Sequence, residues 1–571
     1  MTNDVLSPQR RAESLDTLGR GREHSKVDVV IIGGGVTGVG CALDAATRGL
    51  SVALLEQRDL AAGTSSRSSK LIHGGLRYLE QFDFKLVFEA LQERSLLINR
   101  LAPHLVHPVS FLYPLEHRIW ERPYVGAGIG LYDLLASRGE NPLPRHKHLS
   151  RKGASRLAPG LDPSTFIGAV VYSDAQVDDA RHTLAVARTA AGHGAHILTS
   201  TKVTGINRDG DRATGVTATC LETGRELSIE AGVVINATGV WNDDISDMLG
   251  AGKLRVRASK GIHIVVPRDR LDAGTGIILR TEKSVLFIIP WRAHWLIGTT
   301  DTDWDLDRAH PAASRADIDY LLERVNKVTR RPISIHDIQG VYAGLRPLLS
   351  GESEDTSKLS REHAVARPIP GFITIAGGKY TTYRVMAADA VDAAIGELDR
   401  TAPGSVTADI GLHGADGYHA FLNQRSRLAD ESGIAATCID HLLGRHGSRL
   451  GDVLDLISDR RELAEPLAVG HPYLKAEVVH AARAEGALHL DDVLTRRTRL
   501  SIESWDRAAD VAATTADLMG DVLGWSDSTK VDEISHYQAR VAAERDSQTQ
   551  LDDQTADAAR LGAADVRTGA A

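Results

Sequence analysis

The stretch that most constrains the fold is residues 27–56, VDVVIIGGGVTGVGCALDAATRGLSVALLE. It begins with an apolar, β-branched run typical of a strand buried on both faces. Gly33, Gly35 and Gly38 then form G-x-G-x-x-G, which permits a tight turn, a close approach of backbone to pyrophosphate, and close packing of helix on sheet. A second predicted strand ends at Glu56, whose carboxylate can accept hydrogen bonds from an adenosine ribose. The sequence therefore predicts a Rossmann-like dinucleotide-binding unit.

Composition narrows the class of protein. The 571 residues predict two or three domains, and 42% apolar with 25% charged residues is typical of a globular enzyme. A net charge of −9 gives no general reason to expect a nucleic-acid partner. Cys41, Cys220 and Cys438 form no CxxC pair and are expected to be buried thiols in a reducing cytosol. No apolar run reaches about 18 residues and no secretory signal is visible, so we expect a cytoplasmic chain.

The periodicity changes along the chain. Residues 1–25 are polar and aperiodic, and are expected to form a disordered tail. A predicted helix over 178–192 lies between strand patterns, residues 255–345 are rich in β-type runs that predict an antiparallel sheet, and residues 404–545 read as a helical domain. The last segment, 546–571, is expected to be disordered.

Three further segments are expected to approach the dinucleotide. Residues 64–78, TSSRSSKLIHGGLRY, are dense in hydroxyls, glycines and cations. A buried strand pattern runs into Ala237-Thr238-Gly239, where backbone can come close to a ligand. Residues 372–382 predict a strand, a second glycine turn and a helix start, which suits an anionic edge of a flavin ring.

Two apolar amphipathic segments, 83–101 and 123–137, admit two interpretations. The first has helical spacing, with Asp83 as its predicted N-cap, and we favour a core helix. The alternative is a membrane-surface helix in which Lys85, Arg94 and Arg100 face lipid headgroups.

The motifs together resemble the FAD-dependent glycerol-3-phosphate dehydrogenases of the respiratory, quinone-linked type. The resemblance extends in order over about residues 27–390 and continues at 491–499 in the helical domain. It is carried by GGGVTGVG (33–40), TSSRSSKLIHGGLRYLE (64–80), INATGVW (235–241), SKGIHIVVP (259–267), IGTTDTD (297–303), YAGLRPL (342–348), GGKYTTYR (377–384) and DDVLTRRTR (491–499).

This resemblance implies an α/β fold with a Rossmann-like FAD-binding domain of the glutathione-reductase/amino-acid-oxidase type, an antiparallel β substrate domain and a C-terminal all-helical domain. We expect an FAD-dependent oxidoreductase domain over 26–403, with FAD-binding parts about 26–80, 165–250 and 365–403 and substrate parts about 81–164 and 251–364. The implied reaction oxidises sn-glycerol 3-phosphate to dihydroxyacetone phosphate, with electrons passed to a membrane quinone and peripheral contact with the cytoplasmic membrane. The helical domain has two candidate roles, formation of a homodimer and capping.

The resemblance also suggests residues for the site. It places Arg346, Arg361 and Arg77 near the substrate phosphate, since the planar guanidinium suits phosphate, and Tyr78 in the substrate pocket. Arg346 is favoured because it lies in a predicted Gly-Leu-Arg-Pro turn. The candidate catalytic residues are His73 and His263, either of which can be the base, with Arg346 and Lys379. The predicted cofactor-binding residues are Gly33, Gly35, Gly38, Glu56, Ser65, Ser66, His73, Gly74, Ala237, Gly239, Gly378, Lys379 and Thr381.

Other functions stay open at this point. The same fold and substrate could serve an oxidase that passes electrons to O₂, or an amine- or amino-acid-oxidising flavoprotein that has no need of a phosphate site. A flavin-holding scaffold without turnover is a third alternative. No clustered His/Cys set has metal-ligand spacing, so no metal is predicted.

Overall fold

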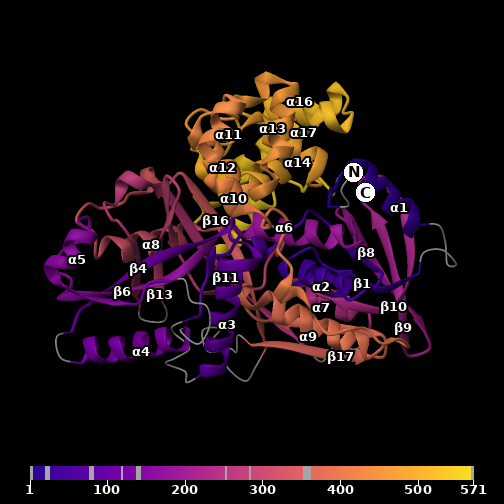
Figure 1. Cartoon of the computed structure of the whole chain (residues 1–571), viewed down its shortest axis with the longest axis horizontal. Coiled ribbons are helices and arrows are strands. Elements are labelled where there is room, and N and C mark those ends of the chain that lie inside the picture. The colour runs from indigo at the N-terminus through magenta and orange to yellow at the C-terminus, as the bar shows by residue number, and fades with distance from the viewer. Residues whose placement is uncertain are drawn as a thin grey trace.

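The computed structural model describes residues 4–19, 26–75, 83–117, 120–136, 143–250, 254–281, 285–350 and 362–567. It divides the chain into a nucleotide-binding domain, a second-sheet domain beside it, and a helical domain that lies against both (Figure 1). The predicted fold class is therefore confirmed. Arg77, Tyr78 and Arg361 lie outside the described residues.

The nucleotide-binding domain is built on a sheet of order β17-β18-β10-β1-β2-β7. All neighbours pair in parallel except β17 with β18. Because β1, β10 and β18 are parallel neighbours, the glycine turns that follow them emerge at one edge of the sheet. The strands are β1 (Val27–Ile32), β2 (Val52–Leu55), β7 (His196–Leu198), β10 (Glu226–Asn236), β17 (His363–Ile369) and β18 (Phe372–Gly377).

Both faces of this sheet are covered, which explains the unbroken apolar run in β1. Val29 and Ile31 pack in one core with α2 (Val36–Thr47), α6 (Asp179–Gly192) and α9 (Tyr383–Ile395). Val30 and Ile32 pack in the other core, against β8 (Thr201–Asp209), β9 (Arg212–Cys220) and α1 (Pro8–Leu18). Alternate residues of a strand point to opposite faces, so both sets are apolar. Cys41 and Cys220 are buried as expected, whereas Cys438 is only half-buried, and all three are free thiols.

The prediction of a disordered N-terminal tail is wrong for residues 4–19. Helix α1 begins at Pro8 after the N-cap Ser7, whose hydroxyl accepts from the Arg10 amide at 3.1 Å. Leu15 and Leu18 are buried against the sheet. The segment is polar on average, but two or three apolar residues on one helical face suffice when a tertiary surface receives them.

Among the described residues, the second-sheet domain has ten strands, in the order β15-β11-β14-β13-β12-β4-β6-β3, with β16 beside β11 and β5 beside β6. Pairing is antiparallel throughout except between β12 and β4. The strands are β3 (Leu71–Ile72), β4 (Val106–Leu115), β5 (Lys147–Ser150), β6 (Gly168–Val177), β11 (Val256–Pro267), β12 (Gly276–Arg280), β13 (Val285–Trp291), β14 (His294–Gly298), β15 (Thr302–Trp304) and β16 (Gly340–Leu349). Helices α5 (Arg151–Leu157) and α8 (Arg315–Asn326) contribute to its core.

One predicted boundary is wrong in this domain. Residues from 165 onward were expected in the FAD-binding part, yet β6 pairs with β4 along its whole length in the second sheet. The chain returns to the nucleotide-binding domain only at α6, which is capped by Asp178. An alternating strand-and-helix pattern does not reveal which of two sheets a strand joins.

The two amphipathic segments form α3 (Phe84–Leu96), which continues as a π-helical stretch (Leu97–Leu101), and α4 (Glu121–Ala136). The predicted cap is confirmed, since the Asp83 carboxylate accepts from the Leu86 amide at 3.1 Å. Arg94 does not face outward as the membrane interpretation required, because it is buried and pairs with Asp174. Within the described ranges, no helix is both long and apolar enough to cross a membrane.

The helical domain has its own apolar core. It comprises α10 (Tyr418–Asn423), α11 (Arg425–Ser432), α12 (Ala436–His446), α13 (Gly451–Asp459), α14 (Lys475–Ala484), a π-helical stretch (Asp492–Arg497), α15 (Leu500–Glu503), α16 (Ala512–Leu523) and α17 (Asp527–Ser547).

The prediction of a disordered C-terminal tail is wrong for residues 546–567. Helix α18 (Asp553–Arg560) packs Ala556 against Trp304 of the second-sheet domain. The buried Lys260 pairs with Asp553 across this contact. Arg567 is buried and binds Asp492 at 2.8 Å. The tail is ordered by polar and apolar contacts to distant parts of the chain.

Candidate active site

The three glycine turns open into a cavity of about 660 Å³ between the nucleotide-binding and second-sheet domains. Gly38, Ser66 and Gly74 do not line it; the Gly74 amide instead donates to the Tyr132 hydroxyl of α4 at 2.8 Å. The predicted residues that line the cavity are Gly33, Gly35, Glu56, Ser65, His73, Ala237, Gly239, His263, Arg346, Gly378, Lys379 and Thr381. The structure thus brings together residues more than 340 positions apart, while their individual roles stay predictions.

The first glycine turn has the geometry needed for a close approach to pyrophosphate. Gly33 has φ +112°, in the region that disfavours residues with a Cβ. A Cβ on Gly38 would lie 1.9 Å from the Gly33 carbonyl oxygen. Gly35 is the N-cap of α2, and Val36 and Thr37 of the first helical turn line the cavity.

We expect Gly38→Ala to remove the cofactor from the purified protein. A methyl group at 1.9 Å must push the turn away from α2, and backbone cannot yield as a flexible side chain can. The ratio of flavin absorbance to protein absorbance measures the loss. Gly444→Ala in α12 is the control, because its Cβ meets nothing within 4 Å. Full flavin content in Gly38→Ala would contradict this account of the turn.

Glu56 is held rigidly at the end of β2. Its carboxylate accepts from the Gly34 amide at 2.7 Å and from the Arg58 amide at 2.8 Å. Ser65 is also fixed, because its hydroxyl accepts from the Val36 amide at 2.9 Å. The carboxylate and hydroxyl are therefore pre-positioned beside the glycine turn.

The glycine turn after β18 lies across the cavity from the first. Gly377 and Gly378 have φ +76° and +79°. The next residues form a 3₁₀ turn before α9 begins, so the helix starts later than the sequence suggested. Thr381 accepts from the His73 amide at 3.1 Å and ties the two predicted cofactor segments together.

Arg346 lies within strand β16 and not in a turn, which corrects the sequence interpretation. Its Nη2 donates to the Thr299 hydroxyl at 3.0 Å and the Thr300 carbonyl at 3.1 Å, and its Nη1 lies 3.4 Å from the Asp301 carboxylate. A Cβ on Gly261 would lie 2.5 Å from Nη2, so this glycine provides the space for the guanidinium. Sequence reasoning missed these partners, although 297–303 carried the family resemblance.

His263 is buried beside Arg346. Its Nε2 lies 3.0 Å from the Ser69 hydroxyl, and its ring stacks on Tyr342 with centroids 4.8 Å apart. Its Nδ1 is buried and has no hydrogen-bond partner among the described residues. Burial, followed by the charges of Lys70 and Arg346, holds the pKa of His263 well below its ordinary value. A neutral imidazole at physiological pH is able to accept a proton.

The loop that carries Ser69 is fixed by a buried ionic network. The Asp179 carboxylate accepts from the Ser68 hydroxyl at 2.7 Å and from Lys70 Nζ at 2.8 Å. Arg499 reaches the same carboxylate from the helical domain at 2.5 Å, and it also binds Asp178 at 2.6 Å. Burial, and next the charge of Arg499, lower the pKa of Lys70 to about 8.

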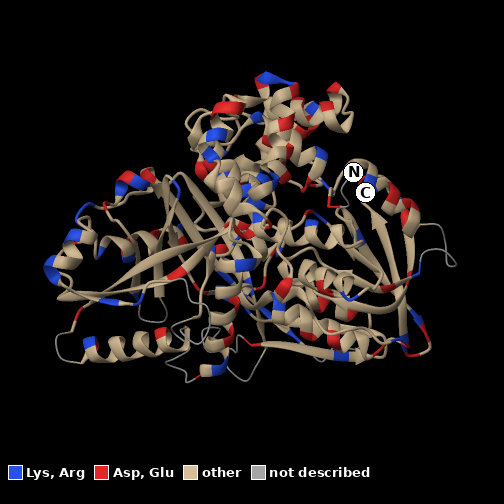
Figure 2. Cartoon of the chain, viewed as in Figure 1, with Lys and Arg blue, Asp and Glu red and all other residues tan. Residues whose placement is uncertain are grey.

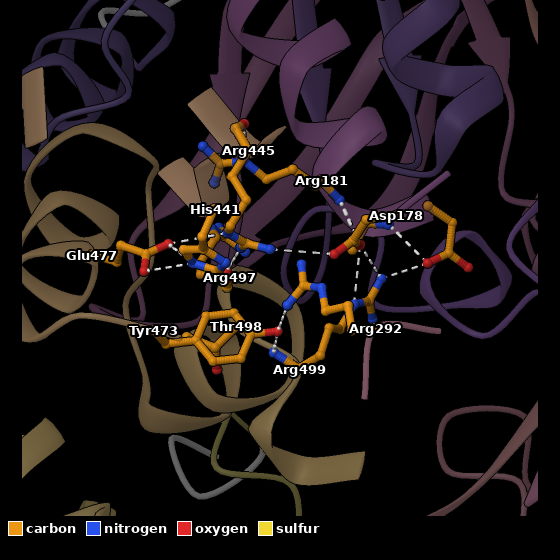
Figure 3. A network of polar contacts seen from close by, with 12 residues as sticks. Asp178, Arg181, Arg292, His441, Arg445, Tyr473, Glu477, Arg497, Thr498 and Arg499 are labelled. Carbon is orange, nitrogen blue, oxygen red and sulfur yellow. Dashed lines mark hydrogen bonds and ion pairs between the residues drawn. The ribbon is translucent and has the colours of Figure 1, made fainter. Parts of the chain in front are cut away.

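Figure 3 shows how this network extends into the helical domain, with Asp178 between Arg499 and Arg445. Glu477 of α14 binds both Arg445 and His441 at 3.0 Å. The motif DDVLTRRTR (491–499), which contains Arg499, was the one sequence feature that pointed to this docking.

Three buried groups with metal-binding capacity, His446, His480 and Glu485, lie close together in the described part of the chain. Arg181 binds Glu485 at 2.5 Å and the His446 ring at 2.8 Å. Arg188 lies 3.4 Å from Nε2 of the third member, His480. Because each of the three groups contacts an arginine, we assign the group to the ionic network.

The cavity fits FAD. Its volume suits an extended ligand, and Glu56 lies beside the glycine turn that follows β1. The glycine turn that follows β18 provides a further backbone surface. Fold and cavity together define a flavin-dependent oxidoreductase. A sequence family described as FAD dependent oxidoreductase matches residues 28–384, and one described as the C-terminal domain of alpha-glycerophosphate oxidase matches residues 405–530.

The chain belongs to the family of FAD-dependent glycerol-3-phosphate dehydrogenases. It is 55% identical over 565 residues to a glycerol-3-phosphate dehydrogenase of Mycobacterium leprae, covering 99% of this chain and 96% of that protein. It is 36% identical to the human mitochondrial glycerol-3-phosphate dehydrogenase, covering 92% and 74% of the two chains. The crystal structure of the Bacillus halodurans glycerol-3-phosphate dehydrogenase complexed with FAD superposes with a TM-score of 0.78 at 27% identity, covering 94% and 98%. The predicted family and cofactor are confirmed.

Proposed function

We propose that this enzyme oxidises sn-glycerol 3-phosphate to dihydroxyacetone phosphate and passes the electrons to a membrane quinone. The observation that carries the proposal is that Arg346 and the buried, neutral His263 line the same cavity as the three glycine turns. One group suits a phosphate dianion and the other suits the proton of a neighbouring hydroxyl. The names of the relatives support the same substrate.

Each residue of the cavity has a separate role in the proposed reaction. FAD supplies the acceptor for the hydride that leaves C2 of the substrate. Arg346 holds the phosphate, and the contacts to Thr299 and Thr300 fix its guanidinium before substrate arrives. His263 takes the hydroxyl proton as C2 becomes a carbonyl carbon. His73 stays the alternative base, because it lines the same cavity. Lys379, which lines the cavity, would hold negative charge on the bound flavin.

Contact with a membrane is part of this proposal. Helices α3 and α4 pack on one another, and they leave large apolar side chains exposed. Figure 2 shows that α4 carries few charges along its length. The exposed residues are Phe84 and Phe88 of α3, Trp120, and Tyr124 and Leu134 of α4. Such a surface suits a peripheral position on the inner face of the cytoplasmic membrane, where a quinone is accessible.

An anaerobic visible spectrum tests the function. The flavin absorbance is expected to bleach on addition of sn-glycerol 3-phosphate and to recover faster with a soluble quinone than with air. Faster recovery in air would favour a glycerol-3-phosphate oxidase, the activity named in the description matched by residues 405–530. An absence of bleaching would contradict the proposed substrate.

The pKa of His263 provides a second test. A histidine whose pKa is lowered stays neutral to lower pH than usual, so we expect its imidazole to titrate well below pH 6.5 in the free holoenzyme. Histidine NMR, with the resonance assigned by its absence in His263→Asn, measures the midpoint. A midpoint at or above 6.5 would contradict the assignment of a buried neutral base.

A further inference from the structure

A second cavity, of about 80 Å³, lies where the helical domain and the C-terminal segment meet the catalytic part of the chain. We call it the arginine cavity, because Arg67, Arg507, Arg540 and Arg560 line it. They come from four separate places: the loop after Ser66, the segment after α15, helix α17 and helix α18. Arg67 also lines the larger cavity, whereas Arg507, Arg540 and Arg560 do not, and no role in the proposed reaction accounts for the convergence of these three.

Two of these arginines are buried without enough protein partners. Arg507 and Arg560 are only 5% and 4% exposed. Nε and Nη1 of Arg507, and Nη1 of Arg560, have no hydrogen-bond partner within the described ranges. The nearest carboxylate to Arg507 is that of Glu544, at 3.7 Å. Burying guanidinium N–H groups in this way is unfavourable unless an anion accepts their hydrogen bonds.

The charges around the cavity do not balance. Arg540 pairs with Asp491, and Arg499, which also reaches the cavity, pairs with Asp178 and Asp179. Among the described residues that line the cavity, that leaves Arg67, Arg507 and Arg560 against the carboxylate of Glu544, an excess of two positive charges, while Asp307 acts on Arg560 from outside the lining. Burial and then the neighbouring Arg540 lower the pKa of Arg560 to about 10, although the carboxylates of Glu544, Asp491 and Asp307 act against this shift.

We propose that the arginine cavity is a binding site for a phosphate dianion. The excess charge equals that of the dianion, and guanidinium groups bind its oxygens through paired, charge-assisted hydrogen bonds. The cavity of about 80 Å³ has room for a tetrahedral oxyanion. The bound anion joins α17 and α18 to the loop that carries Arg67 and Ser69. It therefore stabilises the docking of the C-terminal segment.

This site is separate from the proposed substrate phosphate site at Arg346, and it does not depend on the proposed function. The test uses the holoenzyme with the substitution Arg346→Gln, so that phosphate bound at the proposed substrate site does not contribute to the result. Thermal unfolding is measured with inorganic phosphate and with sodium chloride at equal ionic strength. Phosphate is expected to raise the Tm by about 2 °C or more relative to chloride.

The rise is expected to disappear when either Arg560→Gln or Arg507→Gln is added. It is expected to persist in the control Arg427→Gln, whose side chain is 65% exposed on α11. If Arg560→Gln does not fold, Arg560→Lys keeps the charge and is expected to weaken binding about 10-fold by calorimetry. Glycerol 2-phosphate distinguishes the source of the group: stabilisation by both compounds indicates the phosphate end of a metabolite, and stabilisation by inorganic phosphate alone indicates the free ion. An equal rise in wild type, Arg560→Gln and Arg507→Gln, or no rise at all, would overturn the proposal.

Discussion

Arg346→Ala is expected to lower kcat/KM for sn-glycerol 3-phosphate by about 10²–10⁴-fold, with FAD still bound. Each charge-assisted hydrogen bond to phosphate contributes about 1.5–3 kcal/mol, and a guanidinium makes two. The cofactor should stay, because Arg346 lies on β16 of the second sheet and the glycine turns are built without it. Steady-state kinetics with a soluble acceptor and the flavin spectrum measure the two effects.

Two controls separate substrate binding from damage to the strand. Arg346→Lys keeps a charge but loses the planar fork, so it should recover only part of the activity. Arg257→Ala removes an arginine of the adjacent strand β11 whose partner is the exposed Asp303, and it should leave kcat/KM nearly unchanged. An Arg346→Ala enzyme with wild-type kcat/KM would remove this residue from the site.

Asp179→Asn is expected to have the largest effect on stability, lowering the free energy of unfolding by about 3–5 kcal/mol. The substitution keeps the size of the side chain but removes the charge that both Lys70 and Arg499 face. Both cations are buried; Arg499 keeps its pair with Asp178, but Lys70 loses its carboxylate partner and is left as uncompensated charge in the interior. Thermal or denaturant unfolding of the holoenzyme measures the change.

Glu431→Gln is the matched control, because it breaks an exposed ion pair with Arg427 on α11 and should change stability by less than about 0.5 kcal/mol. The Asp179 variant should also lose activity, since Asp179 holds Ser68 beside Ser69 and His263. Equal stability of the two variants would show that the network does not stabilise the docked helical domain.

The parts of the site that could be predicted are those encoded locally. A strand, a glycine turn and a helix follow one another within about 30 residues, and their chemistry requires glycine where φ is positive or a Cβ would clash. Gly33, Gly35 and Glu56 could therefore be predicted from the sequence. Arg346 could be predicted from the Gly-Leu-Arg-Pro motif. The Gly and Pro of this motif suggested a turn, but the motif lies in a strand.

The errors have a common physical cause. The N- and C-terminal segments look disordered by composition, yet α1 and α18 are ordered because distant surfaces receive Leu18 and Ala556. Arg94 looks like a surface cation, yet Asp174 on β6 neutralises it in the interior. A local sequence pattern indicates the structure that a segment favours on its own. The conformation and burial of these residues depend instead on their tertiary contacts.

The sequence by itself determined the nucleotide-binding unit, the family and the cofactor, because short-range backbone geometry and motif spacing specify them. Only the tertiary structure decided how the helical domain is joined to the catalytic loop through Arg499 and Asp179, and how arginines from four segments enclose one small cavity. Ion pairs and cavities of this kind depend on contacts between residues hundreds of positions apart. Their energy comes from burial, which exists only in the folded chain.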